Sequence, residues 1–198
     1  MPKVIPEYRD EARKKIILIG LEVMSQKGYH NTTLDDIASQ VGVSKTTLYL
    51  YFKNKEDLIV EIIRSVHEDT HSQAIHLFQS ESILDAYVHL LDLFLGRDMI
   101  HVGFIHDILA LSTRNSQIRQ IHQEHLNAVI ENATFGITCL QQKGKVRTDV
   151  EARTMALSLI SLISGMNNLH LKGIEREEIK MRFYDIGKII LGLKDPDG

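Results

Sequence analysis

Proline is almost absent from the body of this chain of 198 residues, and that placement constrains the fold more than any other feature. The prolines are Pro2, Pro6 and Pro196, so nothing between Glu7 and Asp195 forces a helix to end by lacking an N–H donor. Tryptophan is absent, and β-branched residues do not alternate with polar ones over any long run. These features predict an all-α protein.

Composition narrows the class of protein further. Charged residues make up 25% and hydrophobic residues 43%, which excludes intrinsic disorder and a collagen-like chain. The single cysteine, Cys139, excludes an intramolecular disulfide and a zinc site of several cysteines, and we interpret it as an inert packed thiol. The first residues lack the apolar core of a signal peptide, so we expect a cytoplasmic protein.

Charge is distributed unevenly along the chain. Residues 1–55 contain nine Lys/Arg and six Asp/Glu, a net charge of +3, whereas the rest of the chain carries −6. The overall net charge of −3 argues against a protein that coats nucleic acid along its whole surface. A basic head on an acidic body allows one end to face a polyanion, and by charge alone a solvated surface is an equal alternative.

Apolar residues recur at helical spacing, separated by short polar breaks. In the first such segment Ile17, Leu21 and Met24 share one helical face, and Gly28 is placed to end the helix. The expected helices cover residues 9–27, 34–41, 45–51, 55 to about 78, 83–95, 99–112, 115–142, 150–171 and 174–193.

Residues 34–53 fit a helix-turn-helix. Ala38 is a small residue where two short helices would cross, and Gly42 supplies a turn position that tolerates positive φ. Thr33, paired with Asp36, and Ser44 are suited to cap the two helices. The apolar residues that could form a common core are Ile37, Val41, Val43, Leu48 and Phe52.

The outer face of the second of these helices carries Lys45, Thr46, Thr47 and Leu50. Its polar residues are short or cationic, as a helix that enters the major groove of DNA requires. An ordinary pair of packed helices is the alternative, but the crossing residue, the turn glycine and the successive caps agree in favouring DNA binding.

This segment resembles the signature of the tetracycline-repressor (TetR) family of transcriptional regulators. The matching motifs are Gly28-Tyr29, Thr32-Thr33, Ile37-Ala38, Val41-Gly42-Val43-Ser44-Lys45, Thr47-Leu48-Tyr49 and Tyr51-Phe52-Lys53-Asn54-Lys55-Glu56-Asp57-Leu58. The resemblance covers residues 9–70. It implies an all-α homodimer with an N-terminal three-helix DNA-binding domain (residues 9–70, with the helix-turn-helix at about 33–52). A C-terminal helical domain for a small effector and for dimerisation would follow at 71–198.

The resemblance also implies roles for single residues. Phosphate contacts would come from Thr33, Tyr49, Tyr51 and Lys55, with Ser44 at the start of the reading helix, and base edges would be read by Lys45, Thr46 and Thr47. Packing is the alternative for Tyr49 and Tyr51, and we expect Lys53 to be solvated. Two positions depart from the common pattern. Thr46 stands where the family often has Gly or Ala, and Leu50, where it often has Tyr or His, could touch a thymine methyl group or pack inward.

Two helical segments near the C-terminus favour dimerisation. Residues 154–171 carry no formal charge, but too many polar residues interrupt them for a membrane span, so we expect a helix buried on most faces. The residues expected at an interface of four helices between two chains are Ser158, Ser161, Gly165, Phe183, Ile186 and Ile190. Burial of both helices within one chain is the alternative.

The expected effector pocket is formed by Phe94, Arg97, His101, Phe104 and Asn167, each of which could also be ordinary packing. The pairs His67/His71 and His122/His125 have spacings that can bind a metal, but amphipathic helices often show such spacings by chance, and we expect no metal site.

The sequence therefore predicts a ligand-responsive transcriptional regulator, a repressor that binds a pseudo-palindromic operator as a homodimer. The alternatives are a metal-dependent helical enzyme and a helical adaptor that uses the helix-turn-helix for protein contacts. We expect no catalytic residue and no cofactor, because the chain has no phosphate-binding glycine loop, His-Glu-x-x-His or Gly-x-Ser-x-Gly motif.

Overall fold

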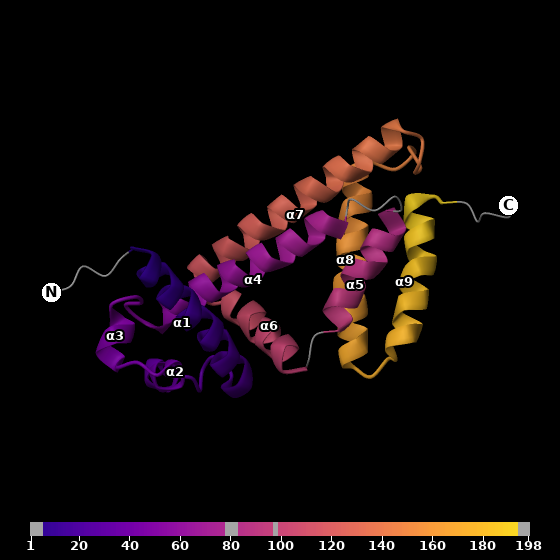
Figure 1. Cartoon of the computed structure of the whole chain (residues 1–198). Coiled ribbons are helices and arrows are strands. Elements are labelled where there is room, and N and C mark those ends of the chain that lie inside the picture. Colours follow the sequence, from indigo (N-terminus) through magenta and orange to yellow (C-terminus); the bar gives the residue numbers. More distant parts are fainter. Residues whose placement is uncertain (1–5, 78–82, 97–98, 194–198) are drawn as a thin grey trace. The chain divides into compact units, whose positions relative to one another are not determined.

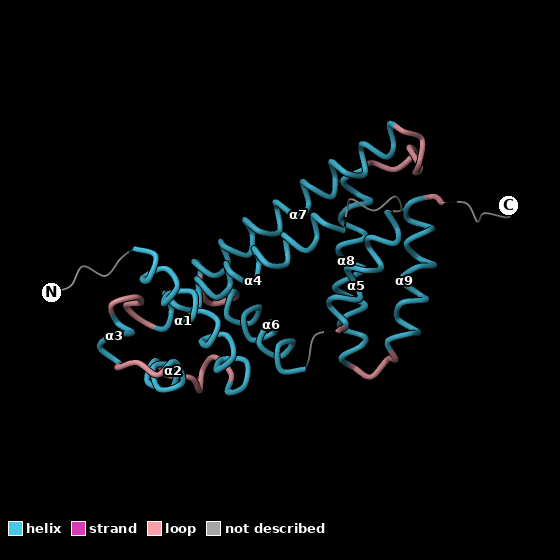
Figure 2. Tube along the Cα trace, viewed as in Figure 1, coloured by secondary structure: helices cyan, strands magenta, loops and turns pink. Residues whose placement is uncertain are grey.

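The computed structural model describes residues 6–77, 83–96 and 99–193, and the described residues are helical with short connections and no strand (Figures 1 and 2). This confirms the predicted all-α class. The helices are α1 (Pro6–Lys27), α2 (Leu34–Val41), α3 (Lys45–Tyr49), α4 (Lys55–Leu77), α5 (Ile83–Leu95), α6 (Met99–Ser112), α7 (Ser116–Gln142), α8 (Ala152–Leu171) and α9 (Arg176–Leu191). Helix boundaries lie within a few residues of the expected ones, and among the described residues no helix has the length and apolarity to cross a membrane.

The chain divides into two compact units. Unit 1 takes the described part of Met1–Asp69 together with Asp98–Gln123, and unit 2 takes Thr70–Arg97 together with the described part of Glu124–Gly198. Helices α4 and α7 each run from one unit into the other. A functional division at residue 70 remains a prediction, but α6 packs with the N-terminal unit rather than with the C-terminal one.

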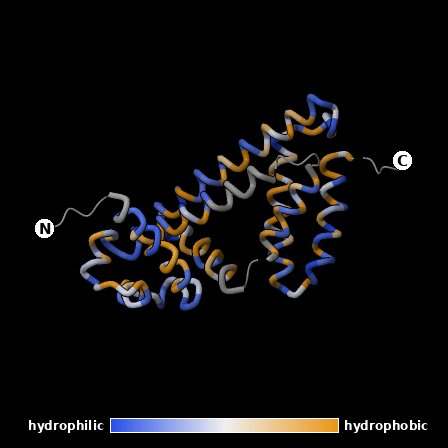
Figure 3. Tube along the Cα trace, viewed as in Figure 1, coloured by the Kyte–Doolittle hydropathy of each residue, from blue (hydrophilic) through white to orange (hydrophobic). Residues whose placement is uncertain are grey.

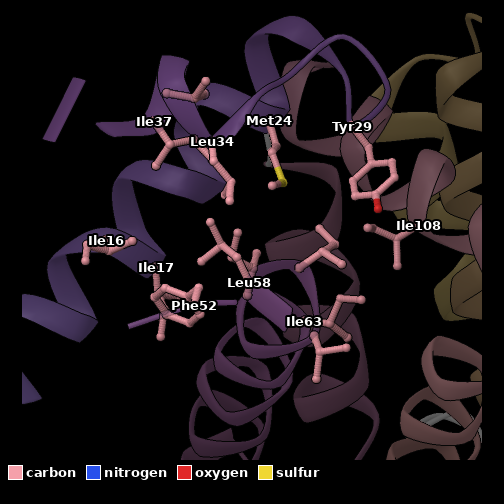
Figure 4. Close-up of a cluster of buried hydrophobic side chains, with 14 of the residues drawn as sticks. Ile16, Ile17, Met24, Tyr29, Leu34, Ile37, Phe52, Leu58, Ile63 and Ile108 are labelled. Carbon is pink, nitrogen blue, oxygen red and sulfur yellow. The ribbon is translucent and has the colours of Figure 1, made fainter. Parts of the chain in front are cut away.

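The core of unit 1 is built from α1, α2, α4 and α6 (Figure 4). Gly20 of α1 lets α4 approach closely, because a Cβ there would lie 3.1 Å from Ile62 and 3.4 Å from Leu58. The buried side chains that fill this core include Ile16, Met24, Leu34, Ile37, Leu58, Ile63, Phe104 and Ile108. Burial of these apolar groups stabilises the packing of α2 and α3 against the other helices of unit 1.

The turn between α2 and α3 has the expected backbone. Gly42 adopts φ +82°, and its N–H donates to the carbonyl of Ala38 at 3.0 Å, where the Val43 N–H also donates at 3.0 Å. These bonds satisfy carbonyls that the end of α2 leaves open. Ala38 is buried at the crossing, as predicted. The expectations for Ala38 and Gly42 are therefore confirmed.

The core of unit 2 is formed by α5, α8 and α9 with part of α7. Apolar residues recur along α8 and α9 (Figure 3), and Leu159 and Phe183 are completely buried. Asp92 of α5 joins α9 electrostatically: it accepts from Arg176 at 2.7 Å and from Lys180 at 3.3 Å. These two partners hold the pKa of Asp92 below its usual value despite desolvation, which opposes them.

Candidate nucleic-acid interface

The solvent face of α3 is the first component of the candidate site. Leu48 and Phe52, four residues apart, are buried and fix which way the helix is turned. The residues on the exposed side, at relative positions i, i+1, i+4 and i+5, are Lys45, Thr46, Tyr49 and Leu50. None of the three expected base readers is fully buried: Lys45 and Thr46 are exposed, and Thr47 is half-buried.

Two hydroxyl groups define the start of α3. The Ser44 Oγ accepts from the Thr47 backbone N–H at 3.1 Å and lies 2.8 Å from the Thr47 Oγ1. Ser44 is thus the N-cap, and the Thr47 hydroxyl is held against it. Within the free chain these groups hold the helix start in shape, and their contacts to DNA remain predictions.

Lys45 has an internal partner on the exposed surface. Its Nζ lies 2.7 Å from the Asp35 Oδ2, and more than half of each side chain is accessible to solvent. The hydrogen bond to Asp35 raises the pKa of Lys45, so the ammonium stays charged. Exposed ion pairs are weak because water and salt screen them. Lys45 can therefore exchange Asp35 for a stronger acceptor.

Thr33 starts α2 through a reciprocal capping box. The Asp36 N–H donates to the Thr33 Oγ1 at 3.1 Å, and the Thr33 N–H donates to the Asp36 Oδ2 at 2.8 Å. Lys27 of α1 donates to the other Asp36 oxygen at 2.6 Å. The bonds from Lys27 and then from Thr33 hold the pKa of Asp36 well below its usual range. Thr33 is exposed at the N-terminus of α2, where its N–H and its hydroxyl both donate to the Asp36 carboxylate.

Lys55 does more inside the protein than the resemblance implied. Its Nζ donates to the carbonyls of Tyr29 and Thr32, both at 2.8 Å, and lies 4.3 Å from the centre of the Tyr29 ring. Two of the three ammonium donors are therefore used to attach α4 to the loop before α2. Burial, followed by the neighbouring Glu56, raises the pKa of Tyr29 to about 12. No sequence signal indicated this role, because both acceptors are backbone carbonyls.

Replacing Lys55 with methionine tests that role. We expect the variant to lose about 2 kcal/mol of unfolding free energy, because hydrogen bonds to charged groups contribute about 1.5–3 kcal/mol and two carbonyls lose their donor. Urea unfolding followed by circular dichroism measures the loss. Lys53→Met, at an exposed neighbouring position, is the matched control and should change stability by less than about 0.5 kcal/mol. Equal stability of the two variants would contradict the structural role.

An open hollow of about 400 Å³ brings these elements together. It lies between the start of α2, the exposed side of α3 and the start of α4. Its lining residues are Thr32, Thr33, Leu34, Asp35, Lys45, Tyr49, Lys53, Asn54 and Lys55. The lining residues that were not in the predicted set are Thr32, Leu34, Asp35, Lys53 and Asn54. The Asn54 Oδ1 caps α4 by accepting from the Asp57 N–H at 2.7 Å, and an asparagine three residues before an aspartate is the sequence signal that could have indicated Asn54.

The two tyrosines after the turn differ in environment. Tyr49 is 45% exposed and lines the hollow, whereas Tyr51 is half-buried and packs against the core of unit 1. Tyr49 is thus accessible to an external partner, whereas part of the Tyr51 side chain is covered by packing within unit 1. Phosphate contacts by either residue remain predictions.

Two of the expected effector-pocket residues have described side chains, one in each unit. Phe104 is buried in the core of unit 1, and Asn167 lies on α8 in unit 2. The side chains of Phe94, Arg97 and His101 lie outside the described residues. The Asn167 Oδ1 is buried and has no hydrogen-bond partner among the described residues.

The expected interface residues lie on α8 and α9, and they divide by exposure. Ser161, Gly165 and Ile186 are exposed, and Ser158 is half-buried. Ile190 is half-buried against the unit 2 core, and Phe183 is 0% exposed. Phe183 is therefore a core residue of the single chain, because its position on α9 faces α5 and α8 rather than solvent.

The histidine pairs do not form a metal site in the described part of the chain. The rings of His67 and His122 meet edge to face with centres 5.1 Å apart, and burial lowers the pKa of His122. The side chain of His71 lies outside the described residues. No group of three or more His, Cys, Asp or Glu residues suited to a metal occurs among those that are described.

Comparison with known proteins gives this geometry its context. Residues 16–62 match the family model of bacterial regulatory proteins of the tetR family. The fatty acid metabolism regulator protein of Bacillus subtilis is 44% identical over 50 residues, which are 25% of this chain and 26% of that protein. The HTH-type transcriptional regulator TtgR of Pseudomonas putida is 24% identical over 177 residues, 81% of this chain and 80% of that one.

Solved structures share the fold. A protein of Saccharomonospora viridis, described as a candidate transcriptional regulator and crystallised in complex with choline, superposes with a TM-score of 0.77. The match covers 89% of this chain and 95% of that one at 23% identity. The family model covers residues 16–62, within the segment from α1 to α4, whereas the superposition with this structure extends over most of the chain.

Proposed function

We propose that this chain, which belongs to the tetR family of bacterial regulatory proteins, represses transcription by binding a pseudo-palindromic operator as a homodimer. A small-molecule effector held by the C-terminal domain releases it. The observation that carries the proposal is the exposed side of α3, where Lys45 and Thr46 are exposed and where Lys45 and Tyr49 line an open hollow. The relatives are named as transcriptional regulators, which points away from an enzyme.

The residues in and beside the hollow support two kinds of contact, to DNA phosphates and to base edges. The Tyr49 hydroxyl offers a donor for phosphate oxygens, and Lys53 adds positive charge. The Thr33 N–H and hydroxyl both donate to Asp36, so they would have to leave that carboxylate to bind a phosphate. Lys45 and Thr46 lie on the exposed side of α3, where a recognition helix meets base edges, and a lysine can donate to guanine O6 and N7. Lys55 keeps one donor for a phosphate while it holds α4 in place.

The exposed surface of α8 and α9 supports dimerisation. Large apolar side chains are exposed there at Leu157, Met181 and Ile189. A Cβ added at Gly165 would meet no described atom within 4 Å, so its small size serves no close approach within the described chain. Two copies would bury this surface in a bundle of four helices. A dimer matters because two recognition helices about 34–36 Å apart reach successive major grooves.

The effector part of the proposal depends on unit 2. The buried amide oxygen of Asn167 has no hydrogen-bond partner among the described residues of unit 2, and choline is bound in the Saccharomonospora viridis structure. An effector can release DNA only if it binds the state that does not fit the operator more tightly than the state that does. Helix α4 begins beside the hollow and continues into unit 2, so it is the element through which such a change would act.

Selection of DNA from a random duplex pool tests the proposal. We expect the full chain to enrich a pseudo-palindrome whose half-sites are about 10 base pairs apart or a multiple of that spacing. Affinity should fall steeply with salt, because each phosphate contact releases counterions. Screening small molecules for release of the selected duplex then identifies the effector. Failure to enrich any sequence at moderate salt would overturn the proposal and favour a helical adaptor.

A further inference from the structure

Leu50 is the one apolar residue among the four on the exposed side of α3, and its exposure is large. It ends the helix, its backbone N–H donates to the Thr47 carbonyl at 3.1 Å, and 69% of the residue is accessible to solvent. The alternative that Leu50 packs inward is therefore wrong. The core positions at this end of α3 are taken by Leu48 and Phe52 on the opposite side.

The position of Leu50 ties it to the candidate base readers. It follows Thr46 by four residues, so the two side chains lie one helical turn apart on the same face. A turn of α-helix rises about 5.4 Å and a base-pair step about 3.4 Å, which places the two residues over neighbouring base pairs when α3 lies along the groove. Leu50 thus extends the exposed side of α3, which begins at Lys45, to the end of the helix.

The chemistry of leucine limits what it can recognise there. Its side chain has no hydrogen-bond donor or acceptor, so it cannot read the polar pattern of a base edge. The apolar group that a base pair presents in the major groove is the C5-methyl of thymine. We propose that Leu50 selects a thymine in each half-site by contact with that methyl group. This inference rests on the proposed DNA-binding function.

Deoxyuridine provides the test, because it keeps the base pairing of thymine and lacks only the methyl group. Each thymine of the duplex selected from the random pool is replaced in turn, and affinity is measured by fluorescence anisotropy at fixed salt. With the unmodified protein we expect one thymine per half-site whose replacement weakens binding by about fourfold, the effect of removing one methyl group from an apolar neighbour. Replacement in both half-sites should weaken binding by about 15-fold.

The variant Leu50→Ala completes the cycle. It should bind the thymine duplex more weakly than the unmodified protein and should lose the dependence on the methyl group at that one position. Leu18→Ala is the matched control: Leu18 is 62% exposed, lies on α1 of the same unit, and should keep the full deoxyuridine effect. Thermal unfolding confirms that both variants fold, as expected for exposed positions.

The outcomes separate the two levels of inference. If a sequence is enriched but no thymine shows the methyl effect, or if Leu50→Ala retains it, the thymine contact is wrong and the DNA-binding proposal stands. If no duplex is enriched at all, the proposed function fails and the thymine contact fails with it. A methyl effect that disappears only in Leu50→Ala supports both.

Discussion

Replacing Ile189 with aspartate is expected to convert the proposed dimer into monomers and to weaken operator binding by about 100-fold or more. Ile189 is 71% exposed on α9, and exposed Met181 and Ile186 lie on the same helix. An aspartate in an apolar interface would bury an unpaired charge in each of the two copies, and such a charge costs several kcal/mol. The monomer then binds through a single recognition helix and loses the advantage of linked half-sites.

Light scattering at micromolar protein concentration measures the change of mass, and anisotropy with the selected duplex measures affinity. The fold should survive, because the Ile189 side chain is exposed and only its backbone carbonyl is used, by Arg147 at 3.3 Å and by the Gly192 N–H at 3.3 Å. Leu18→Asp places the same charge at an exposed leucine of α1 and should remain a dimer. An Ile189→Asp protein that stays dimeric would exclude this part of α9 from the interface.

Replacing Lys45 and Thr46 together with alanine is expected to weaken operator binding by about 100-fold without changing the oligomeric state. Each good base contact contributes about 1–3 kcal/mol of discrimination, and a homodimer loses every contact twice. Thr47 is left in place because its hydroxyl is held by Ser44. Lys145→Ala removes the same charge from an exposed position of unit 2 and should bind almost normally.

Asp35→Asn is expected to change DNA affinity in the opposite direction in the same experiment. Removing its charge frees Lys45 and takes a negative group away from the candidate DNA surface, so binding to DNA should strengthen. Unchanged affinity in the Lys45/Thr46 double variant would show that these two side chains do not read the operator. Unchanged affinity in Asp35→Asn alone would show that the ion pair does not compete with DNA.

The helix-turn-helix could be predicted from sequence because its signals are local. Gly42 needs positive φ, and Thr33 and Ser44 cap helices within three residues of themselves, so short segments determine these features. The structure agrees with them closely. The same locality explains why Leu48 could be assigned to the core. Of the predicted outer face of α3, Lys45, Thr46 and Leu50 are exposed, but Thr47 is half-buried and Tyr49 is exposed in its stead.

Features that depend on distant partners could not be predicted. Asp92 meets Arg176 across 84 residues of sequence, and Lys55 binds carbonyls, which every residue carries. The place of Phe104 in the core of unit 1 depends on where α6 packs, which its apolar pattern does not specify. For Asn167, burial without a partner is a tertiary property that no spacing signals.

On the proposed function, the bond between Lys45 and Asp35 affects how strongly the protein binds DNA of random sequence. While no DNA is bound, the carboxylate occupies the cation that would otherwise attach to any passing phosphate. Random sequence therefore has to compete with a neighbour that is already in place, whereas a correctly positioned guanine can replace it with two acceptors. On the proposed function, breaking the ion pair weakens binding at every site, and the two acceptors of a guanine offset that loss only where Lys45 meets one.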